Sequence, residues 1–308
     1  MLHMASPFGT IAVIADPRAG VLDQLPVLER VLDERGLEHR TLVANGADPS
    51  ALATSALDEG FRFLVAVGND ETVQAVVNGM FRDGTPILED PVLGVIGAGS
   101  GCDLVRSFGV PGDTESAAAH LVGENTYALD LMKITSTGSS GERRTRYGHN
   151  LAQVGMGAQQ VACAAKAPAW LGGSRRFYGF WCGYLKTKAM RFTIEHDTRT
   201  WEGRAWNVVV ANAQFTGGGL RLSPRSFPGD GVLDALVFTG PRSGAYTQLP
   251  RLFRHGDHVP DPHIEELKAK IRFEVRSERP MPVLADGVTL GTTPATFQIV
   301  PRTILFKL

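Results

Sequence analysis

The chain has 308 residues, of which 43% are hydrophobic and 20% charged, and its formal net charge is -1. This composition is typical of a globular protein with one large or two ordinary domains, and the small net charge gives no general attraction to nucleic acid. The three cysteines, Cys102, Cys163 and Cys182, are too few and too scattered for a disulfide framework or a zinc site. The sequence shows neither a secretory signal nor an apolar run of about 18 residues, so we expect a cytoplasmic protein.

The first part of the chain alternates short apolar segments with amphipathic ones. Strands are predicted at residues 10–15, 39–44, 61–68 and 92–97, and helices at residues 22–35, 49–57 and 72–82. This alternation favours an α/β fold with a parallel sheet and helices on both faces. Ligands of such folds bind beyond the carboxyl ends of the strands, so we expect the polar turns after Ala15, Val67 and Ile96 to share one edge.

From about residue 128 the pattern changes, and strand-like segments dominate. They are found at residues 127–135, 205–215, 231–238, 270–277, 281–287, 295–300 and 303–308. This part of the sequence predicts a mostly antiparallel β domain. One helical interruption, at about residues 159–191, carries aromatic side chains such as Trp170 and Trp181 among basic residues.

The turn at residues 68–72 raises a question about phosphate binding. It joins a buried strand to a helix, and a helix N-terminus offers N–H groups and a positive dipole end to a phosphate. Such turns are usually rich in glycine, because glycine lets the backbone approach the phosphate. Here only Gly68 is glycine, and Asn69, Asp70 and Glu71 follow it. The turn therefore has the design of a phosphate site but carries, at Glu71, a group that opposes phosphate.

Several motifs stand in a fixed order along the chain. They are Asp16-Pro17-Arg18-Ala19-Gly20, Gly68-Asn69-Asp70-Glu71-Thr72, Gly97-Ala98-Gly99-Ser100-Gly101-Cys102-Asp103, RSFGVP at 106–111, NAQFTGGGLRLSP at 212–224, GDGVLD at 229–234 and LADGVTLG at 284–291. Together they resemble the diacylglycerol kinase catalytic family, which includes sphingosine kinases and bacterial lipid kinases. The second motif stands for the family's Gly-Gly-Asp-Gly-Thr and the last for its Asp-Gly-Glu, both in degenerate form. No motif is decisive alone, but the order covers nearly the whole chain.

The resemblance implies a fold and a reaction. The fold is a Rossmann-like parallel-sheet domain, similar to that of NAD kinases and diacylglycerol kinases, followed by an antiparallel β-sandwich domain. We place the nucleotide-binding domain at residues 1–130 and the lipid-binding domain at residues 131–302, with the tail at about 303–308 returning to the first. The implied reaction transfers the γ-phosphoryl group of ATP to the hydroxyl of diacylglycerol or a related lipid, with Mg²⁺.

The resemblance also implies roles for single residues. The nucleotide-binding set comprises Asp16, Ala19, Gly20, Thr41, Gly68, Asn69, Asp70, Glu71, Thr72, Gly99, Ser100, Gly101 and Asp103. Asp70 and Asp286 stand at catalytic positions. A structural Mg²⁺ would be held by the Asp230 carboxylate and by the backbone carbonyls of Val232 and Phe227, since this ion prefers oxygen ligands.

Two departures from the family pattern fall on the chemistry. A carboxylate at Glu71, about 4 Å from a phosphate charge, costs roughly 4 kcal/mol at an effective dielectric constant near 20 unless a metal ion or basic side chain lies between them. Val288 stands where the family places the glutamate that accepts the lipid hydroxyl proton, and a general base typically contributes about 10²–10⁴-fold. Three interpretations stay open: a lipid kinase, a catalytically impaired relative that binds nucleotide, lipid or a partner subunit, and a kinase whose base has moved to Asp286 or Glu71.

Each motif also has a purely structural interpretation. Asp70 and Asp103 are suited to capping helices, Asp230 to a hairpin turn, and the glycines of 97–101 to a strand-to-helix turn. The aromatic and basic segment at 170–191 fits either a helix packed on the core or a lid that touches an anionic membrane. The expected partners are a lipid substrate and a membrane surface, with a homodimer left open and nucleic acid not expected.

Overall fold

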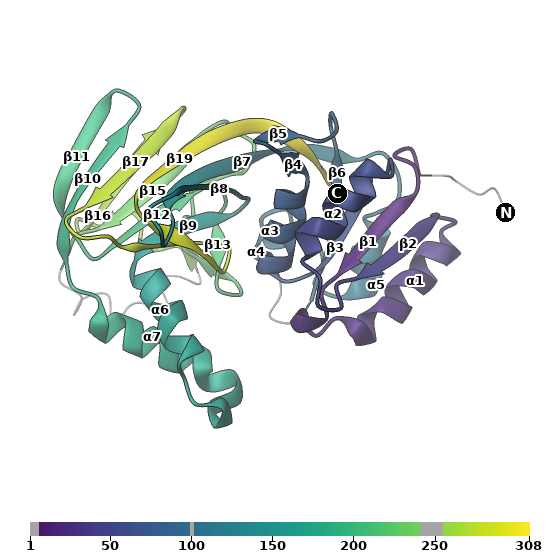
Figure 1. The fold of residues 1–308 in the computed structure, drawn as a ribbon, viewed down its shortest axis with the longest axis horizontal. Helices are drawn as coiled ribbons and strands as arrows, with labels where there is room; N and C mark the ends of the chain where they lie inside the picture. The colour runs from purple at the N-terminus through teal and green to yellow at the C-terminus, as the bar shows by residue number, and fades with distance from the viewer. Residues whose placement is uncertain (1–5, 99–101, 241–254) are drawn as a thin grey trace. The chain divides into compact units, whose positions relative to one another are not determined.

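The computed structural model describes residues 6–98, 102–240 and 255–308. The chain forms two compact units, each with its own core (Figure 1). The first unit comprises residues 1–131, 217–219 and 300–308, and the second comprises residues 132–216 and 220–299. No feature of the sequence indicates that residues 217–219 belong with the first unit.

The first unit is an α/β structure built on parallel strands. Its strands are β1 (Ile11–Ala15), β2 (His39–Val43), β3 (Phe63–Gly68) and β6 (Val92–Gly97), with a short pair β4 (Phe81–Arg82) and β5 (Thr85–Pro86). Its helices are α1 (Leu25–Glu34), α2 (Pro49–Asp58), α3 (Asp70–Gly79), α4 (Asp103–Ser107) and α5 (Thr114–Ala119), with short 3-10 turns η1 (Pro17–Ala19) and η2 (Leu22–Gln24). The parallel strands stand in the order β2-β1-β3-β6, which confirms the predicted fold class.

Helices can cover both faces of these strands because the strands are apolar on both sides. Every residue of β1 and β3 is buried. Alternate strand residues, Val13 and Val65 among them, form one core cluster with α1 and α5. The intervening residues point to the other face, where α2 and α3 pack together (Figure 1). The Asp48 side chain caps α2 by accepting a hydrogen bond from the Ser50 N–H at 3.0 Å, as predicted.

The register of the parallel strands aligns their carboxyl ends. Ala15 of β1 pairs with Val67 of β3, and Gly68 of β3 pairs with Gly97 of β6. The loops after β1, β3 and β6 therefore leave the sheet at the same edge, as the sequence predicted. This edge carries the candidate nucleotide site.

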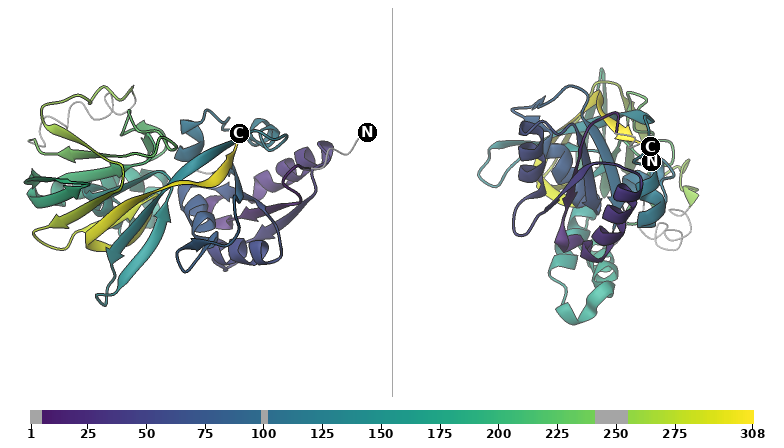
Figure 2. Two further views of the ribbon diagram at one scale, coloured as in Figure 1. Left: turned by 90° about the horizontal axis from the view of Figure 1, so that it is seen from above. Right: turned by 90° about the vertical axis from the view of Figure 1, so that its right-hand side faces the viewer.

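The second unit is an antiparallel β-sandwich. Its strands are β8 (Arg143–Gly148), β9 (Leu151–Gly155), β10 (Met190–His196), β11 (Arg199–Ala205), β12 (Asn207–Ala211), β13 (Phe215–Thr216), β14 (Leu220–Arg221), β15 (Leu233–Phe238), β16 (Ile264–Ala269), β17 (Arg272–Ser277) and β18 (Pro282–Ala285). One run of pairing is β16-β15-β12-β9-β18 and another is β11-β10-β17. Side chains from both runs, including Val154, Phe192 and Phe273, enclose one buried core, and the left view of Figure 2 shows the layered strands.

A helical hairpin covers the outer face of part of this sandwich. It consists of α6 (Met156–Ala165), the 3-10 segment η3 (Ala169–Ser174) and α7 (Arg175–Lys186). Met156 and Tyr184 of the hairpin pack with Val209 and Phe238 of the strands in a second core cluster. Figure 1 and the right view of Figure 2 show the hairpin extending away from the strands.

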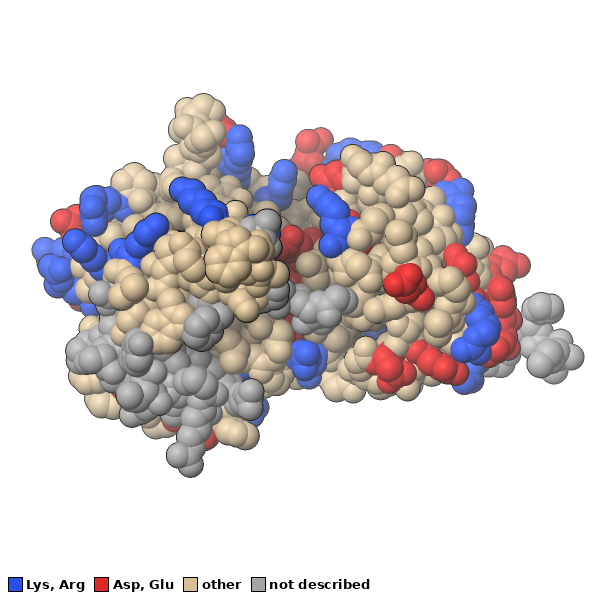
Figure 3. Space-filling model, turned by 90° about the horizontal axis from the view of Figure 1, so that it is seen from below, with Lys and Arg blue, Asp and Glu red and all other residues tan. Residues whose placement is uncertain are grey.

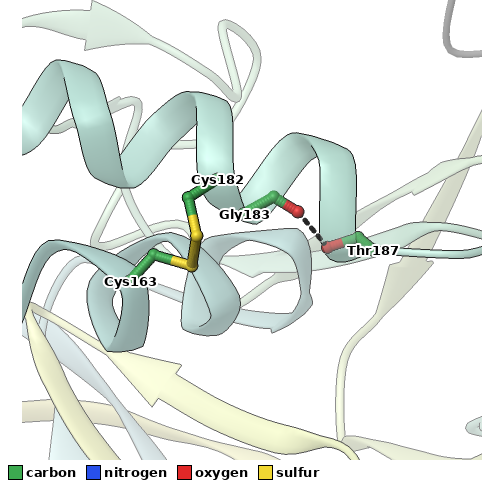
Figure 4. The surroundings of a disulfide bond; sticks show 4 residues. All are labelled: Cys163, Cys182, Gly183 and Thr187. Carbon is green, nitrogen blue, oxygen red and sulfur yellow. Dashed lines mark hydrogen bonds between the residues drawn. A yellow bond between two sulfur atoms is a disulfide. The ribbon is translucent and has the colours of Figure 1, made fainter. Parts of the chain in front are cut away.

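A disulfide between Cys163 and Cys182 joins α6 to α7 (Figure 4). The same figure shows the Thr187 hydroxyl donating a hydrogen bond to the Gly183 carbonyl at 2.7 Å, where α7 ends. The sequence analysis did not anticipate this bond, since it judged the cysteines too scattered for a disulfide framework. A single pair 19 residues apart gives no spacing signal.

Two long strands belong to both units. β7 (Thr126–Thr137) and β19 (Val288–Lys307) pass through the division of the chain. β19 pairs with β17 and β18 in the second unit, and its residues Leu305 and Phe306 pair in parallel with Val92 and Leu93 of β6 in the first. Each of these two strands therefore contributes residues to both units, which the sequence did not indicate.

Candidate functional site

The loop after β1 is organised by Asp16, which is 4% exposed. Its carboxylate accepts hydrogen bonds from the Arg18 backbone N–H at 3.0 Å and from the Arg18 guanidinium at 2.8 to 3.2 Å. Burial raises the pKa of Asp16, but the hydrogen bonds and charge of Arg18 outweigh it and hold the pKa below its ordinary value. The loop passes through Ala19 and closes at Gly20, whose φ of 70° suits glycine.

The turn between β3 and α3 has the geometry of a well-capped helix start. The Asn69 side-chain oxygen accepts a hydrogen bond from the Thr72 N–H at 3.1 Å, so asparagine is the N-cap. A Cβ on Gly68 would lie 2.7 Å from the Thr72 Cβ, so glycine is required for this close approach. The Thr72 hydroxyl lies 3.5 Å from Asp16, which joins this turn to the loop after β1. The loss of two of the three family glycines has therefore not removed the turn.

Asp70 connects the turn to α4. Its Oδ1 accepts hydrogen bonds from the Asp103 backbone N–H at 2.9 Å and from the Cys102 thiol at 3.2 Å. Cys102 occupies the N-cap position of α4 without a capping side-chain bond. Asp70 therefore caps the neighbouring helix α4 rather than its own helix α3. The sequence suggested a capping role for Asp70 but did not indicate which helix it caps.

Asp103 is almost completely buried, with 1% of its surface exposed. Its Oδ2 accepts a hydrogen bond from the Gly218 N–H at 2.9 Å, and its Oδ1 lies 3.4 Å from the Arg106 guanidinium. Burial and the nearby charge of Asp70 raise the pKa of Asp103 to about 6. The sequence assigned the glycine run at 217–219 to the other domain and so could not place this contact.

Glu71 is exposed in the first turn of α3. The pKa of Arg18 is raised by its hydrogen bond to Asp16, by the charge of Asp16 and, more weakly, by the charges of Asp48 and Glu71. A guanidinium within electrostatic reach of Glu71 offsets part of the repulsion that this carboxylate would exert on a phosphate. Arg18 is a site residue that the sequence analysis did not single out, because it occupies the variable position of its motif.

Not every predicted nucleotide residue joins this group. Thr41 lies in the middle of β2, opposite Val13, and its hydroxyl donates a hydrogen bond to Glu29 of α1 at 2.6 Å. Gly99, Ser100 and Gly101 lie outside the described residues. The described part of the site thus consists of the loop after β1, the turn before α3 and the start of α4.

In the second unit, Asp286 occupies the turn between β18 and β19 and is 7% exposed. Its carboxylate accepts hydrogen bonds from three successive backbone N–H groups, those of His149, Asn150 and Leu151, at 2.8, 3.2 and 3.1 Å. Val288, at the family's base position, begins β19 and packs against the sandwich core. A valine cannot accept a proton, so this position cannot supply a general base.

The predicted metal loop lies between β14 and β15. The Asp230 carboxylate accepts a hydrogen bond from the Val232 N–H at 3.0 Å, and the Phe227 carbonyl accepts one from the Gly229 N–H at 2.9 Å. The proposed donors are one carboxylate and two carbonyls, a set of hard oxygens whose chemistry fits Mg²⁺. The Asp230 contact is also that of an ordinary Asx turn, so the structural alternative stands beside the metal.

The comparisons with known proteins agree with these two units. Residues 10–134 match the family described as the diacylglycerol kinase catalytic domain, and residues 152–306 match the YegS C-terminal NAD kinase beta sandwich-like domain. The chain belongs to the diacylglycerol kinase catalytic family. It is 27% identical over 267 residues to the "Diacylglycerol kinase" of Bacillus subtilis strain 168, covering 84% of this chain and 81% of the relative. It is 26% identical over 277 residues to the "Probable lipid kinase YegS-like" of Stenotrophomonas maltophilia strain K279a, covering 88% and 86%.

Solved structures show the same fold. A diacylglycerol kinase from Bacillus anthracis str. Sterne superposes with a TM-score of 0.70 at 19% identity, covering 98% of this chain and 97% of that one. Yeast NADH kinase complexed with NADH superposes with a TM-score of 0.54 at 11% identity, covering 97% and 83%. The predicted similarity to the NAD kinase fold is therefore confirmed. Within the described residues, no helix has both the length and the apolar character needed to cross a bilayer.

Proposed function

We propose that this chain is an ATP-dependent lipid kinase that transfers the γ-phosphoryl group to a lipid hydroxyl, that of diacylglycerol or a related lipid. The observation that carries the proposal is the pairing of both family domains in one chain with an intact strand-end edge in the first unit. Relatives that match this chain over more than four fifths of their own length are named "Diacylglycerol kinase" and "Probable lipid kinase YegS-like".

The first unit supplies groups suited to a nucleoside triphosphate. The start of α3, with its Asn69 cap and close-packed Gly68, directs a helix N-terminus to the edge where strands β1, β3 and β6 end. Arg18 adds a cation to the same edge. A divalent ion bound with the nucleotide would neutralise phosphate charge during transfer, and the carboxylates of Asp70 and Asp103, which meet at the start of α4, would be candidates to hold it.

The second unit supplies a surface suited to a membrane. Trp170 is 82% exposed, Leu185 70% and Tyr178 43%, and all three lie on the α6–α7 hairpin. Lys186 and Lys188 are exposed at the end of α7. On the face drawn in Figure 3, Lys and Arg gather over the second unit. Exposed aromatic side chains beside lysines favour contact with the headgroups of an anionic bilayer, where the lipid substrate resides.

A second candidate function is nucleotide or lipid binding without transfer, and Val288 favours it. One experiment separates the two. The purified chain is incubated with Mg²⁺, radiolabelled ATP and vesicles that contain diacylglycerol, and label in the lipid is counted beside calorimetric ATP binding. A lipid kinase labels the lipid, and Asp70→Asn reduces the label. ATP binding with no labelled lipid would instead establish the impaired relative.

A further inference from the structure

The segment at residues 156–188, which contains the α6–α7 hairpin, has a charge of its own. It carries basic residues and no aspartate or glutamate, although the whole chain has a formal net charge of -1. Its lysines, Lys166, Lys186 and Lys188, are exposed. A local positive charge attracts an anionic lipid surface even where the net charge of the protein is near zero.

The Cys163–Cys182 disulfide closes a loop that contains part of this surface. The two cysteines are 19 residues apart. Between them lie Trp170, which is 82% exposed, and Tyr178, which is 43% exposed. The bond therefore restrains the segment whose exposed aromatic side chains would meet a bilayer.

The contact between α6 and α7 beside this bond is made by small residues. A Cβ on Gly179 would lie 2.6 Å from the Ala164 Cβ, and a Cβ on Gly183 would lie 2.7 Å from the Gln160 backbone nitrogen. The two helices therefore approach each other backbone to backbone. Since glycine and alanine bury little apolar area, the covalent bond supplies much of the restraint between the helices.

The anchoring of α7 to the sandwich changes along the helix. Tyr184 is 7% exposed and belongs to a core cluster on which Phe180 and Trp181 also pack. At the start of α7, the Arg175 guanidinium donates an exposed hydrogen bond to the Ala165 carbonyl of α6 at 3.2 Å. The end of α7 is thus held by the sandwich, whereas the segment that leads from α6 into α7 depends on the helix contact and the disulfide.

We propose that the Cys163–Cys182 disulfide is a thiol-sensitive switch for docking of the α6–α7 hairpin on an anionic membrane surface. The inference rests on the membrane contact in the proposed function. The closed bond holds Trp170 and Tyr178 in the arrangement that docks, and reduction by a dithiol releases the loop that carries them. A loop that must be ordered again on the membrane docks more weakly.

The reduction step is an ordinary thiol–disulfide exchange. Cys163 is 3% exposed and Cys182 is half-buried, so a thiolate of the dithiol reaches the Cys182 sulfur more readily. The new S–S bond forms there as the Cys163–Cys182 bond breaks, and the electron pair leaves on the Cys163 sulfur, which takes up a proton. The second thiol of the reductant then displaces Cys182 as a thiol, and the reductant becomes a disulfide.

The test measures binding of the full chain to vesicles without ATP. The chain is equilibrated with oxidised or reduced dithiothreitol and sedimented with phosphatidylcholine vesicles that contain phosphatidylglycerol. Thiol titration in denaturant should count one thiol, that of Cys102, in the oxidised chain and three in the reduced chain. Reduction should lower the partition coefficient several-fold, and at most by about 100-fold, the constraint expected for a loop of this length.

Two variants serve as controls. The double variant Cys163→Ser/Cys182→Ser should bind like the reduced wild type and should not respond to the dithiol. It keeps Cys102, so it separates the hairpin bond from the remaining thiol. Trp170→Ala should weaken binding of the oxidised chain, because it removes the most exposed aromatic side chain of the loop.

The possible failures are distinct. Equal binding by the oxidised and reduced chains would overturn the inference, and so would three titratable thiols after oxidation. A dithiol response that persists in the double variant would also overturn it and assign the response to Cys102. The proposed function is tested separately on the same samples, by transfer of label from ATP to a short-chain diacylglycerol dissolved without vesicles. Absence of labelled lipid there would overturn the proposed function, while sedimentation alone decides the inference.

Discussion

The turn before α3 in the first unit and the buried cluster around Asp286 in the second are held together over very different sequence distances. The turn depends on the Asn69 side chain and the Thr72 N–H, three residues apart. The cluster depends on Asp286 and the backbone of His149, 137 residues apart. The local site keeps its geometry although two of the family's glycines are replaced, because Asn69, at one of these two positions, caps α3 with its own side chain. The contacts of the long-range site depend on the register between β9 and β18, two strands that lie far apart in the sequence.

The comparison also separates two kinds of departure from the family. Glu71 is exposed, and its charge is opposed by Arg18 on the adjacent loop. Val288 packs against the core, and its hydrocarbon side chain cannot accept a proton in any conformation. An electrostatic departure on the surface can thus be compensated by one nearby side chain, whereas a missing proton acceptor needs another residue.

The largest predicted effect concerns the long-range cluster. Asp286→Ala leaves three buried N–H groups without their acceptor, at about 1–3 kcal/mol for each group, so the second unit should lose several kcal/mol of unfolding free energy. All four tryptophans of the chain lie in the second unit, so their fluorescence in urea measures it. Asp197 is the matched control because it also accepts from three successive N–H groups, those of residues 270–272, but is exposed.

Asp197→Ala should therefore shift the urea midpoint much less than Asp286→Ala, since water can replace an exposed acceptor. Equal shifts would mean that burial adds nothing to the Asp286 contacts. That result would remove the distinction between a solvated turn and a buried cluster.

The next effect concerns Asp103 in the first unit. Its pKa of about 6 lies above the unfolded value, so the folded state binds more protons between pH 4 and 6 and stability falls as pH rises through this range. Asp103→Asn removes this loss and should stabilise the first unit above pH 6 by up to about 3 kcal/mol. Calorimetry at pH 4 and pH 7.5 measures the difference between the two proteins.

Asp113→Asn is the contrasting control, because the pKa of Asp113 is lowered by its hydrogen bonds from Ser116. A group of this kind stabilises above its unfolded pKa, and its contribution disappears as pH falls. The two variants should therefore change the pH dependence of Tm with opposite signs. A wild type and Asp103→Asn with parallel pH profiles would show that Asp103 does not retain its proton as described.

The smallest effect concerns the surface charge at Glu71. Glu71→Gly should tighten ATP binding by about 1 kcal/mol, the interaction of two charges 4 Å apart in water. In the Arg18→Ala variant, Glu71→Gly should tighten ATP binding by a larger amount than in the wild type, because the guanidinium that offsets the Glu71 charge is gone. Calorimetric titration of the four proteins forms a double-mutant cycle. Weaker ATP binding by Glu71→Gly would mean that Glu71 recruits a metal ion instead of opposing the phosphate.

Much of the first unit could be predicted from sequence because its signals are local. The period of the apolar residues gave the strands and helices, and strand ends in a parallel sheet must share an edge. The caps at Asp48 and Asn69 lie within three residues of the N–H groups they accept. The same reasoning misplaced the role of Asp70, since its partner is the start of a helix 33 residues later.

The second unit could be predicted as a sandwich but not as a site. Alternating apolar strands predict the layers, whereas the partners of Asp286 depend on the register between β9 and β18. The Cys163–Cys182 bond was missed for the same reason: it depends on how α6 packs on α7.

The central claim is that this chain transfers the γ-phosphoryl group to a lipid although position 288 lacks a carboxylate, and substitutions at this position test it most directly. Turnover with Mg²⁺, ATP and diacylglycerol vesicles is measured for the wild type and Val288→Glu, with Val288→Gln as the control that cannot accept a proton. The account predicts labelled lipid from the wild type and a kcat higher by about 10²–10⁴-fold in Val288→Glu, while Val288→Gln leaves kcat unchanged. No labelled lipid from either the wild type or Val288→Glu would contradict the claim.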